Sequence, residues 1–282
     1  MSETKTPATL EARNLVKDFK LRSGLKTSIL HAVKDVSFTI ESGKTIALVG
    51  ESGSGKSTIA RMLMKLETPT SGAILLDGVE TPNHGRAIAN YRSEVQMIFQ
   101  DPFASLNPFH TILHHLERPI RLHSPRLSTT QVRERAYELL ERVRLSPASH
   151  YADRRPHELS GGQRQRVAIA RALAPGARFI VADEPVSMLD VSIRLGVLNL
   201  LADLQREDNL GVLYITHDLA TARHFSDEIM VLYHGDVVER GPADEVILNP
   251  QHSYTKTLLN AAPEPENLGN LRDEVRRELA GL

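Results

Sequence analysis

The sequence predicts an α/β fold with a mostly parallel sheet, and three observations support this prediction. A glycine-rich turn at residues 50–58 follows a short β-branched apolar run, residues 45–49, and precedes a helix-like stretch. From residue 160 onward, apolar runs of strand length alternate with stretches of helix length, which is typical of a parallel sheet covered by helices. Residues 103–158 show no clear strand pattern, so we expect a helical subdomain of about residues 103–174 inserted into the α/β core.

The residue pattern of the N-terminal part predicts an antiparallel β subdomain. Residues 1–8 are expected to be disordered, and residues 9–42 alternate in a strand-like way up to the turn at Ser42-Gly43. A further strand at residues 73–76 ends in the turn Asp77-Gly78.

The central and C-terminal elements follow in order. A strand at residues 95–99 ends before Gln100, and residues 131–144 form an amphipathic helix for which Ser128 and Gln131 make a capping box. The later elements are helices at residues 163–173, 191–206 and 219–225, strands at 178–183 and 212–216, and a short β pair around His234-Gly235. We expect the domain to end near residue 260 and residues 261–282 to form a linker and a short charged tail helix.

Composition narrows the class of protein. The 282 residues are 41% hydrophobic and 24% charged, which is ordinary for a globular chain. The net charge is −1, which argues against a nucleic-acid partner, because such proteins usually need a basic face. There is no cysteine, so disulfides and thiolate metal sites are excluded. No apolar run approaches the ~20 residues of a membrane span, and the N-terminus lacks the apolar region of a signal peptide.

The turn Gly50-Glu51-Ser52-Gly53-Ser54-Gly55-Lys56-Ser57-Thr58 predicts a phosphate-binding loop. The three glycines allow positive φ and close backbone approach to an anion, and the following helix start adds its dipole and free N–H groups. Lys56 is expected to reach the β/γ-phosphates, and the Ser57 hydroxyl to bind Mg²⁺. The alternative is a flexible Gly/Ser loop.

Two carboxylates follow the apolar strand that ends at residue 183. Asp183 and Glu184 are expected at the carboxyl edge of the sheet, where open α/β sheets bind ligands. Asp183 can hold Mg²⁺ through water, and Glu184 can polarise a water in line with the γ-phosphate.

A second anion site is predicted at the helix start within Leu159-Ser160-Gly161-Gly162-Gln163. The alternative is an ordinary Ser-Gly helix cap. One chain rarely needs two phosphate cradles for one nucleotide, unless the second cradle serves a nucleotide held by another subunit.

These three motifs, in this order, resemble the ATPase subunit of an ABC transporter over roughly residues 9–260. The resemblance implies a P-loop NTPase (RecA-like) core, ATP and Mg²⁺ as ligands, and hydrolysis of ATP coupled to transport. It implies that Ser160, Gly162 and Gln163 contact the γ-phosphate of ATP bound to the opposite subunit. The residues implied to bind nucleotide are Phe19, Gly50, Glu51, Ser52, Gly53, Ser54, Gly55, Lys56, Ser57, Thr58, Ser160, Gly161, Gly162, Gln163 and Asp190.

The resemblance also implies roles outside the three motifs. Gln100 corresponds to the Q-loop residue that touches Mg²⁺ and the attacking water, and His217 to the switch histidine on the γ-phosphate. Asp190 corresponds to the D-loop, and Phe19 to an aromatic residue against adenine. Each has an alternative: a strand-end cap for Gln100, a turn histidine for His217 and a core residue for Phe19.

Residues 97–108, 190–193 and 249–256 resemble more closely the oligopeptide/dipeptide/nickel importer branch. That branch implies a second ATPase subunit, two membrane permease subunits and an external binding protein, and a location on the cytoplasmic face of the cell membrane. Cargo would be peptides, nickel or short oligosaccharides. The chain departs from the branch at Met188, at Leu195-Gly196, and in lacking a C-terminal cysteine cluster.

Rival interpretations remain at this point: an ABC-type ATPase acting on DNA or ribosomes, the ATPase of an exporter, or a regulatory module without turnover. The single cassette and the neutral charge disfavour the first, the resemblance to the peptide-importer branch disfavours the second, and the intact hydrolytic residues disfavour the third. The histidines at 110, 114, 115 and 123 suggest a metal site only weakly, because neighbours on a helix point about 100° apart.

Overall fold

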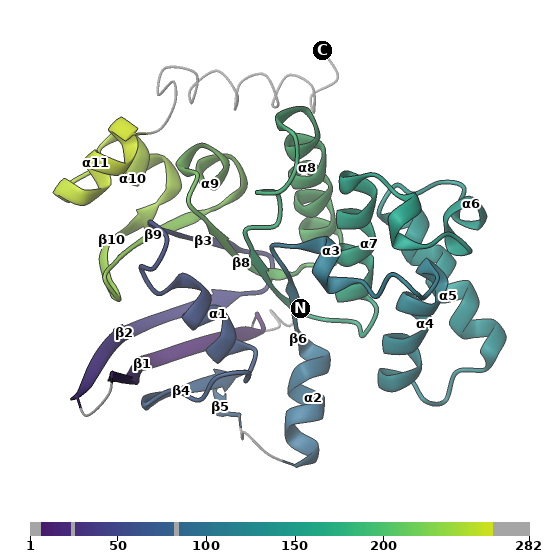
Figure 1. Ribbon diagram of the computed structural model, residues 1–282, viewed down its shortest axis with the longest axis horizontal. Coiled ribbons are helices and arrows are strands. Elements are labelled where there is room, and N and C mark those ends of the chain that lie inside the picture. The colour runs from purple at the N-terminus through teal and green to yellow at the C-terminus, as the bar shows by residue number, and fades with distance from the viewer. Residues whose placement is uncertain (1–6, 24–25, 82–84, 262–282) are drawn as a thin grey trace, which may run out of the picture. The chain divides into compact units, whose positions relative to one another are not determined.

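The computed structural model describes residues 7–23, 26–81 and 85–261, and these residues form two compact units (Figure 1). We call the first the helical unit; it contains residues 7–10, Glu41–Gly43 and Leu75–Val212. We call the second the phosphate-loop unit; it contains Glu11–Ile40, Lys44–Ile74 and residues 213–261. The predicted α/β class is confirmed. The expected tail helix and residues 1–6 lie outside the described residues.

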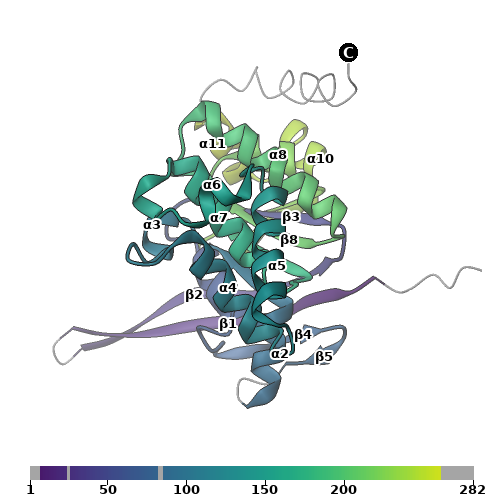
Figure 2. The ribbon, with the colours of Figure 1, turned by 90° about the vertical axis from the view of Figure 1, so that its right-hand side faces the viewer.

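The β subdomain consists of long strands, as the alternation at residues 9–42 predicted. Strands β1 (Thr9–Ser23) and β2 (Lys26–Glu41) run side by side (Figure 2), and β4 (Ser71–Leu76) lies on the other side of β1. Within the helical unit, the end of β4 pairs antiparallel with β5 (Val79–Glu80), with Leu75 opposite Glu80.

The phosphate-loop unit also holds a parallel strand pair. Strand β3 (Thr45–Val49) is buried along its whole length and pairs parallel with β9 (Glu228–Tyr233), while β9 pairs antiparallel with β10 (Asp236–Pro242). Strand β8 (Gly211–Thr216), which enters this unit at residue 213, lies on the other side of β3. The predicted strands are therefore present.

Four helices belong to the phosphate-loop unit: α1 (Lys56–Leu63), α9 (Leu219–Phe225), α10 (Ala243–Leu248) and α11 (Ser253–Ala261). Helix α9 packs on β3 and on α10. The sequence interpretation predicted α1 and α9 but no helix over α10 or α11.

The helical unit pairs strand β6 (Val95–Ile98) parallel with β7 (Phe179–Asp183), with Val95 opposite Phe179. Between residues 102 and 173 every described element is a helix, although the limits of the inserted subdomain remain a prediction. The helices of this unit are α2 (Arg86–Glu94), α3 (Pro102–Ser105), α4 (Ile112–His123), α5 (Thr129–Arg142), α6 (Ala148–Ala152), the 3₁₀ turn η1 (Pro156–Glu158), α7 (Gly161–Leu173) and α8 (Val191–Glu207). Among the described residues, no helix is long and apolar enough to cross a membrane.

Helix α5 starts as the sequence predicted. The Ser128 Oγ accepts a hydrogen bond from the Gln131 N–H at 3.3 Å, and the Gln131 Oε1 accepts one from the Ser128 N–H at 2.9 Å. This reciprocal pair satisfies two of the N–H groups that a helix start leaves unbonded.

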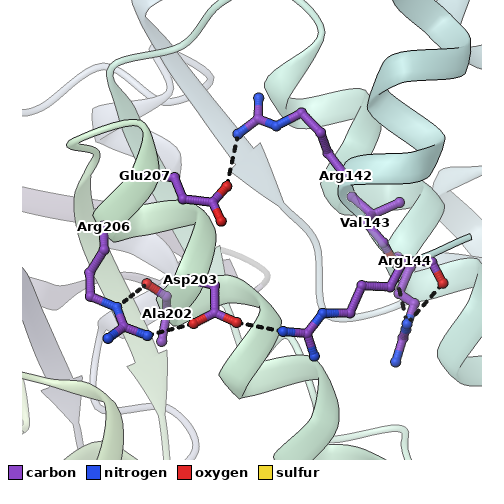
Figure 3. A network of polar contacts seen from close by, with 8 residues as sticks. Arg142, Val143, Arg144, Ala202, Asp203, Arg206 and Glu207 are labelled. Carbon is purple, nitrogen blue, oxygen red and sulfur yellow. Dashed lines mark hydrogen bonds and ion pairs between the residues drawn. The ribbon is translucent and has the colours of Figure 1, made fainter. Parts of the chain in front are cut away.

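The far end of α5 is joined to α8 by charged side chains (Figure 3). Asp203 accepts hydrogen bonds from both Arg144 and Arg206, each at 2.5 Å, and Arg142 lies 3.7 Å from Glu207. These side chains are partly exposed, so each pair contributes at most about 1 kcal/mol. The network therefore orients the end of α5 on α8, and its contribution to the free energy of unfolding is small.

Helix α11 is anchored at its N-terminus by Glu239 of β10. The two carboxylate oxygens accept hydrogen bonds from the Gln251 N–H at 2.7 Å and the His252 N–H at 3.0 Å. Burial alone would raise the pKa of Glu239, but the backbone hydrogen bond from Gln251, the Thr255 side chain, the backbone hydrogen bond from His252 and the charge of His252 together lower the pKa. The ionised carboxylate thus serves as an acidic cap just before the helix.

We expect the Glu239→Gln variant to lose stability in a pH-dependent way. A carboxylate whose pKa is lowered by folding stabilises the protein above its unfolded pKa of about 4.3, and this stabilisation disappears as the pH falls through the folded value. The melting temperature of the wild type should therefore exceed that of the variant at pH 7, and the gap should shrink below about pH 4.3. Thermal denaturation of both proteins between pH 3 and pH 7 measures this; a gap that stays constant over the range contradicts the prediction.

Candidate functional site

The phosphate loop is built around a buried lysine. The Lys56 side chain is 6% exposed, and its Nζ donates to the Gly50 carbonyl at 2.6 Å and to the Glu51 carbonyl at 2.8 Å. The loop therefore folds back over its own lysine and holds the ammonium group at the start of α1. A buried ammonium group beside a helix N-terminus is a suitable partner for a phosphate.

The glycines of this loop are required for two different reasons. Gly53 and Gly55 have φ values of 82° and 115°, as predicted. Gly50 does not share this positive φ, so the expectation for it was wrong. A Cβ at Gly50 would instead lie 2.3 Å from the Leu232 carbonyl oxygen, so glycine is needed there for close packing of the loop on β9.

The hydroxyl groups of the loop differ in exposure. The Ser57 residue, next to the lysine, is exposed, and Thr58 is half-buried. Ser54 is buried, and its carbonyl accepts a hydrogen bond from the Gly235 N–H at 2.9 Å. Glu51 and Ser52 are exposed residues of the same turn. Ser57 thus offers a solvent-exposed hydroxyl, and Ser54 holds the loop through its backbone carbonyl.

His217 belongs to the same unit and is also exposed. It follows the last residue of β8, Thr216, and precedes Asp218, which caps α9 by accepting from the Ala220 N–H at 2.9 Å. The Asp218 N–H in turn donates to the Thr216 hydroxyl at 3.0 Å. The turn that carries His217 is therefore fixed on both sides.

In the helical unit, the end of β7 brings two of the predicted residues together. Asp183 is the buried last residue of the strand, and the Glu184 Oε2 accepts a hydrogen bond from the Gln100 Nε2 at 2.9 Å. Gln100 follows β6, the strand paired with β7, so the predicted sheet edge explains this contact. An amide and a carboxylate in contact form a group that can orient and polarise a water molecule.

Glu184 has an unusual backbone conformation that was not predicted. Its φ is 45°, in the left-handed region that costs a non-glycine residue roughly 1–3 kcal/mol. The conformation is supported by the Ser187 hydroxyl, which donates to the Glu184 carbonyl at 3.0 Å. Such strain is often found where a side chain must be aimed at a reacting group.

The residues that follow lead into α8. Met188, where the sequence departs from its branch, is 58% exposed, and Asp190 is the exposed residue that precedes the helix. The Leu189 carbonyl between them accepts a hydrogen bond from the Arg194 Nε at 2.8 Å. Nothing in the structure explains the choice of Met188.

The Ser-Gly-Gly-Gln segment forms a capped helix start. Ser160 is exposed, its Oγ accepts from the Gln163 N–H at 3.3 Å, and the Gln163 Oε1 accepts from the Ser160 N–H at 2.9 Å. The helix-cap alternative is therefore correct for this structure, and it is compatible with a phosphate site because α7 still begins there. Gly162 is buried, and a Cβ on it would lie 2.6 Å from the Ile193 Cγ2, so glycine lets α7 approach α8.

Two arginines of α7 connect this helix to the segment after Gln100, a link that sequence reasoning missed. The Arg164 guanidinium lies 4.1 Å from the centre of the Phe103 ring, and Arg171 donates to the Ser105 carbonyl. Phe103 and Ser105 belong to α3, which begins two residues after Gln100. The spacing of seven between the arginines, two turns on one helix face, was the available signal.

Phe19 and the histidines at positions 110, 114 and 115 each have defined contacts. Phe19 is half-buried on β1, with the Lys17 Nζ 4.9 Å from its ring centre, so the core interpretation of Phe19 is not supported. The His110 and His114 rings are stacked with centres 4.1 Å apart, while His115 is buried and its Nε2 contacts the Asn107 carbonyl at 3.0 Å.

Comparison with known families adds two matches. A family model described as "ABC transporter" matches residues 33–187, which include the phosphate loop, Gln100, the Ser-Gly-Gly-Gln segment and Glu184. A second model, described as "Oligopeptide/dipeptide transporter, C-terminal region", matches residues 238–280.

Several curated relatives are similar over most of the chain. The oligopeptide transport ATP-binding protein AppF of Bacillus subtilis is 45% identical over 94% of this chain and 81% of its own length. The dipeptide transport ATP-binding protein DppF of Haemophilus influenzae is 44% identical over 95% of this chain and 80% of its own length. The glutathione import ATP-binding protein GsiA of Escherichia coli is 48% identical over 91% of this chain, which spans 41% of that relative.

Solved structures agree with the fold. A dimeric ATP-binding cassette in a post-hydrolysis state, bound to ADP and Pi, is 33% identical with a TM-score of 0.72 and covers 83% of this chain and 98% of its own. The cbiO1 protein of Clostridium perfringens, part of a transporter complex, is 26% identical with a TM-score of 0.74 and covers 94% of this chain and 98% of its own.

Proposed function

We propose, from the premise that this chain belongs to the ABC transporter family of ATP-binding subunits, that it hydrolyses ATP to drive peptide uptake through separate membrane subunits. The observation that carries the proposal is the phosphate loop folded around the buried Lys56. The C-terminal match and the peptide-importer relatives support peptides over nickel or short oligosaccharides as cargo. They also favour an importer over the rival exporter, DNA and ribosome interpretations.

The proposed nucleotide site is shared between two such subunits. One subunit holds the phosphates of ATP with the loop of residues 50–58 and Lys56, with Phe19 against the adenine, and its His217 on the γ-phosphate. The other subunit contributes Ser160, Gly162 and Gln163 at the start of its α7, together with Asp190. The dimeric relative bound to ADP and Pi supports this arrangement. The second subunit is either a copy of this chain or a paralogue, and the subunit composition of the purified complex distinguishes the two.

The predicted magnesium ligands have suitable chemistry. Taken one by one, the exposed Ser57 hydroxyl, the Asp183 carboxylate and the Gln100 amide offer oxygen atoms of the kind that Mg²⁺ prefers. If bound, such an ion would neutralise charge on the phosphates. Glu184 would accept a proton from the attacking water, while Gln100 holds that carboxylate in place through the 2.9 Å hydrogen bond. Most of the catalytic effect comes from positioning and charge neutralisation.

The membrane subunits are proposed to contact the segment after Gln100. Three phenylalanines in or beside this segment are partly or fully exposed: Phe99 at 40%, Phe103 at 51% and Phe109 at 81%. Exposed aromatic side chains this close together in sequence are typical of a segment that contacts a partner, because aromatic residues are enriched at interfaces. Because Gln100 bonds to Glu184, a partner on this segment is connected to the hydrolytic carboxylate. The chain is then peripheral, on the cytoplasmic face of the membrane.

We expect Phe109→Asp to uncouple the subunit from its membrane partners. The charge would be buried at the interface without a partner, so co-purification with the permease subunits and peptide-driven ATP hydrolysis should fall by at least about tenfold. The measurements are co-purification with the permease subunits, peptide-driven ATP hydrolysis, and ATP-dependent uptake of labelled oligopeptide, dipeptide and glutathione into vesicles that contain the cognate permease and the second ATPase subunit.

The matched control is Leu122→Asp, which places the same charge at a 74%-exposed position near the end of α4. ATP binding by the isolated subunit should be unchanged in both variants. Normal assembly and uptake with Phe109→Asp would move the permease contact elsewhere, and uptake of none of the three peptides by the wild-type complex would contradict the proposed cargo.

A further inference from the structure

The C-terminal helix α11 reaches the phosphate loop through one tyrosine. The Glu51 N–H donates a hydrogen bond to the Tyr254 hydroxyl at 3.1 Å, and Tyr254 is only 8% exposed. Glu51 is the second residue of the loop, and Tyr254 lies about two hundred positions later in the segment that matches the C-terminal transporter region.

The position of Tyr254 is fixed from three sides. Its ring lies against that of Tyr233, at the end of β9, with the ring centres 4.1 Å apart. Its N–H donates to the His252 Nδ1 at 3.2 Å, and Glu239 holds the two residues that precede α11 by their N–H groups. The packed ring and the anchored helix start therefore hold the Tyr254 hydroxyl in the position from which it contacts the loop.

Glu51 connects this hydroxyl to the lysine that binds phosphate. The Glu51 carbonyl accepts hydrogen bonds from the Lys56 Nζ at 2.8 Å and from the Ser54 N–H at 3.2 Å. The Glu51 N–H donates to the Tyr254 hydroxyl. The backbone of Glu51 thus bonds to the protein at both ends. Any rotation of this peptide would break the tyrosine contact and move a carbonyl that holds the lysine.

We propose that Tyr254 is a positioning residue for the phosphate loop, which sets the Glu51 peptide and through it Lys56 in the conformation that receives the phosphates of ATP. This inference rests on the proposed function, because it assumes that the loop binds a nucleotide. In this proposal α11 contributes to nucleotide affinity, because its tyrosine holds the loop that binds ATP. The proposed contribution of Glu51 to nucleotide binding is then indirect.

The test is the Tyr254→Phe variant, which keeps the ring stacked on Tyr233 and removes only the hydroxyl. The loss of one neutral hydrogen bond should raise the Kd of a fluorescent ATP analogue and the KM for ATP by about 3- to 10-fold. The kcat should stay within about twofold of wild type, because Tyr254 touches no reacting atom. Both constants are measured on the full chain with Mg²⁺, together with the melting temperature.

The matched control is Tyr137→Phe, which removes a hydroxyl that contacts Arg133 at 3.4 Å on the exposed face of α5. It should leave Kd, KM and kcat unchanged. A second variant, Glu239→Gln, loosens the start of α11 with Tyr254 intact and should raise the KM in the same direction as Tyr254→Phe.

The outcomes separate this inference from the proposed function. A wild-type protein that neither binds nor hydrolyses ATP with its partner subunits overturns the proposed function itself. A wild type that binds ATP while Tyr254→Phe binds it equally well overturns only the role of Tyr254. A Tyr254→Phe variant with lowered kcat and unchanged KM also overturns that role, since loop positioning acts on nucleotide binding.

Discussion

Replacing Glu184 with glutamine should leave ATP binding intact and lower steady-state phosphate release by at least about 100-fold, because a general base contributes roughly 10²–10⁴ to a rate. The glutamine has the same shape, and its oxygen can still accept the hydrogen bond that the carboxylate now accepts from Gln100 at 2.9 Å. Only the ability to take a proton is lost. The strained backbone at φ 45° should persist, since the Ser187 hydroxyl bonds to the Glu184 carbonyl and not to its side chain.

The measurements are phosphate release and the Kd of a fluorescent ATP analogue, both with Mg²⁺. The matched control is Glu207→Gln, the same chemical change at the end of α8, where the carboxylate makes only a 3.7 Å ion pair with Arg142 (Figure 3). That control should hydrolyse ATP like the wild type. Phosphate release from Glu184→Gln close to the wild-type rate would remove Glu184 from the role of base.

Replacing Ser160 with arginine should abolish ATP-dependent dimerisation and spare ATP binding by the monomer. In the proposed sandwich, Ser160 faces the γ-phosphate held by the opposite subunit, where a long side chain has no room. Closure that depends on this contact should therefore fail. The comparison is best made in the Glu184→Gln background, in which ATP is not consumed, by gel filtration with and without nucleotide.

Loss of the helix cap must be separated from loss of the contact between subunits. Ser160 caps α7, and removing such a cap typically costs about 1 kcal/mol. Ser128→Arg removes a cap of the same geometry from α5, with the same 3.3 Å and 2.9 Å hydrogen bonds. This control should show a similar loss of stability and normal dimerisation. Dimers that form equally with both arginine variants would refute the role of Ser160 between subunits.

Local patterns predicted those parts of the chain that short-range chemistry decides. Strand β3 and helix α9 were predicted with the bounds that the structure has, and the capping box of α5 was predicted from two residues three apart. Each of these depends on residues that are neighbours in sequence: a β-branched run, an Asp cap or a Ser–Gln pair. The motif residues were identified for the same reason.

Other features depend on residues far apart in sequence, and they were not predicted. Gly50 is a glycine because the Leu232 carbonyl lies beside it, not because its φ is positive. The stacking of Arg164 on Phe103 joins residues that are 61 positions apart. Helices α10 and α11 were not predicted, and both are held by residues distant in sequence: α10 packs on α9, and Glu239 anchors the start of α11.

The sequence by itself determined the α/β class, the phosphate loop, the order of the motifs and the membership of the chain in its family, because each of these is written in short runs of residues. Only the tertiary structure decided that Gln100 bonds to Glu184, that Glu184 has a strained backbone, and that the Tyr254 hydroxyl reaches the Glu51 amide. The physical reason is that hydrogen bonds and close packing depend on distances in space, and a chain of this length brings together residues that no local pattern connects.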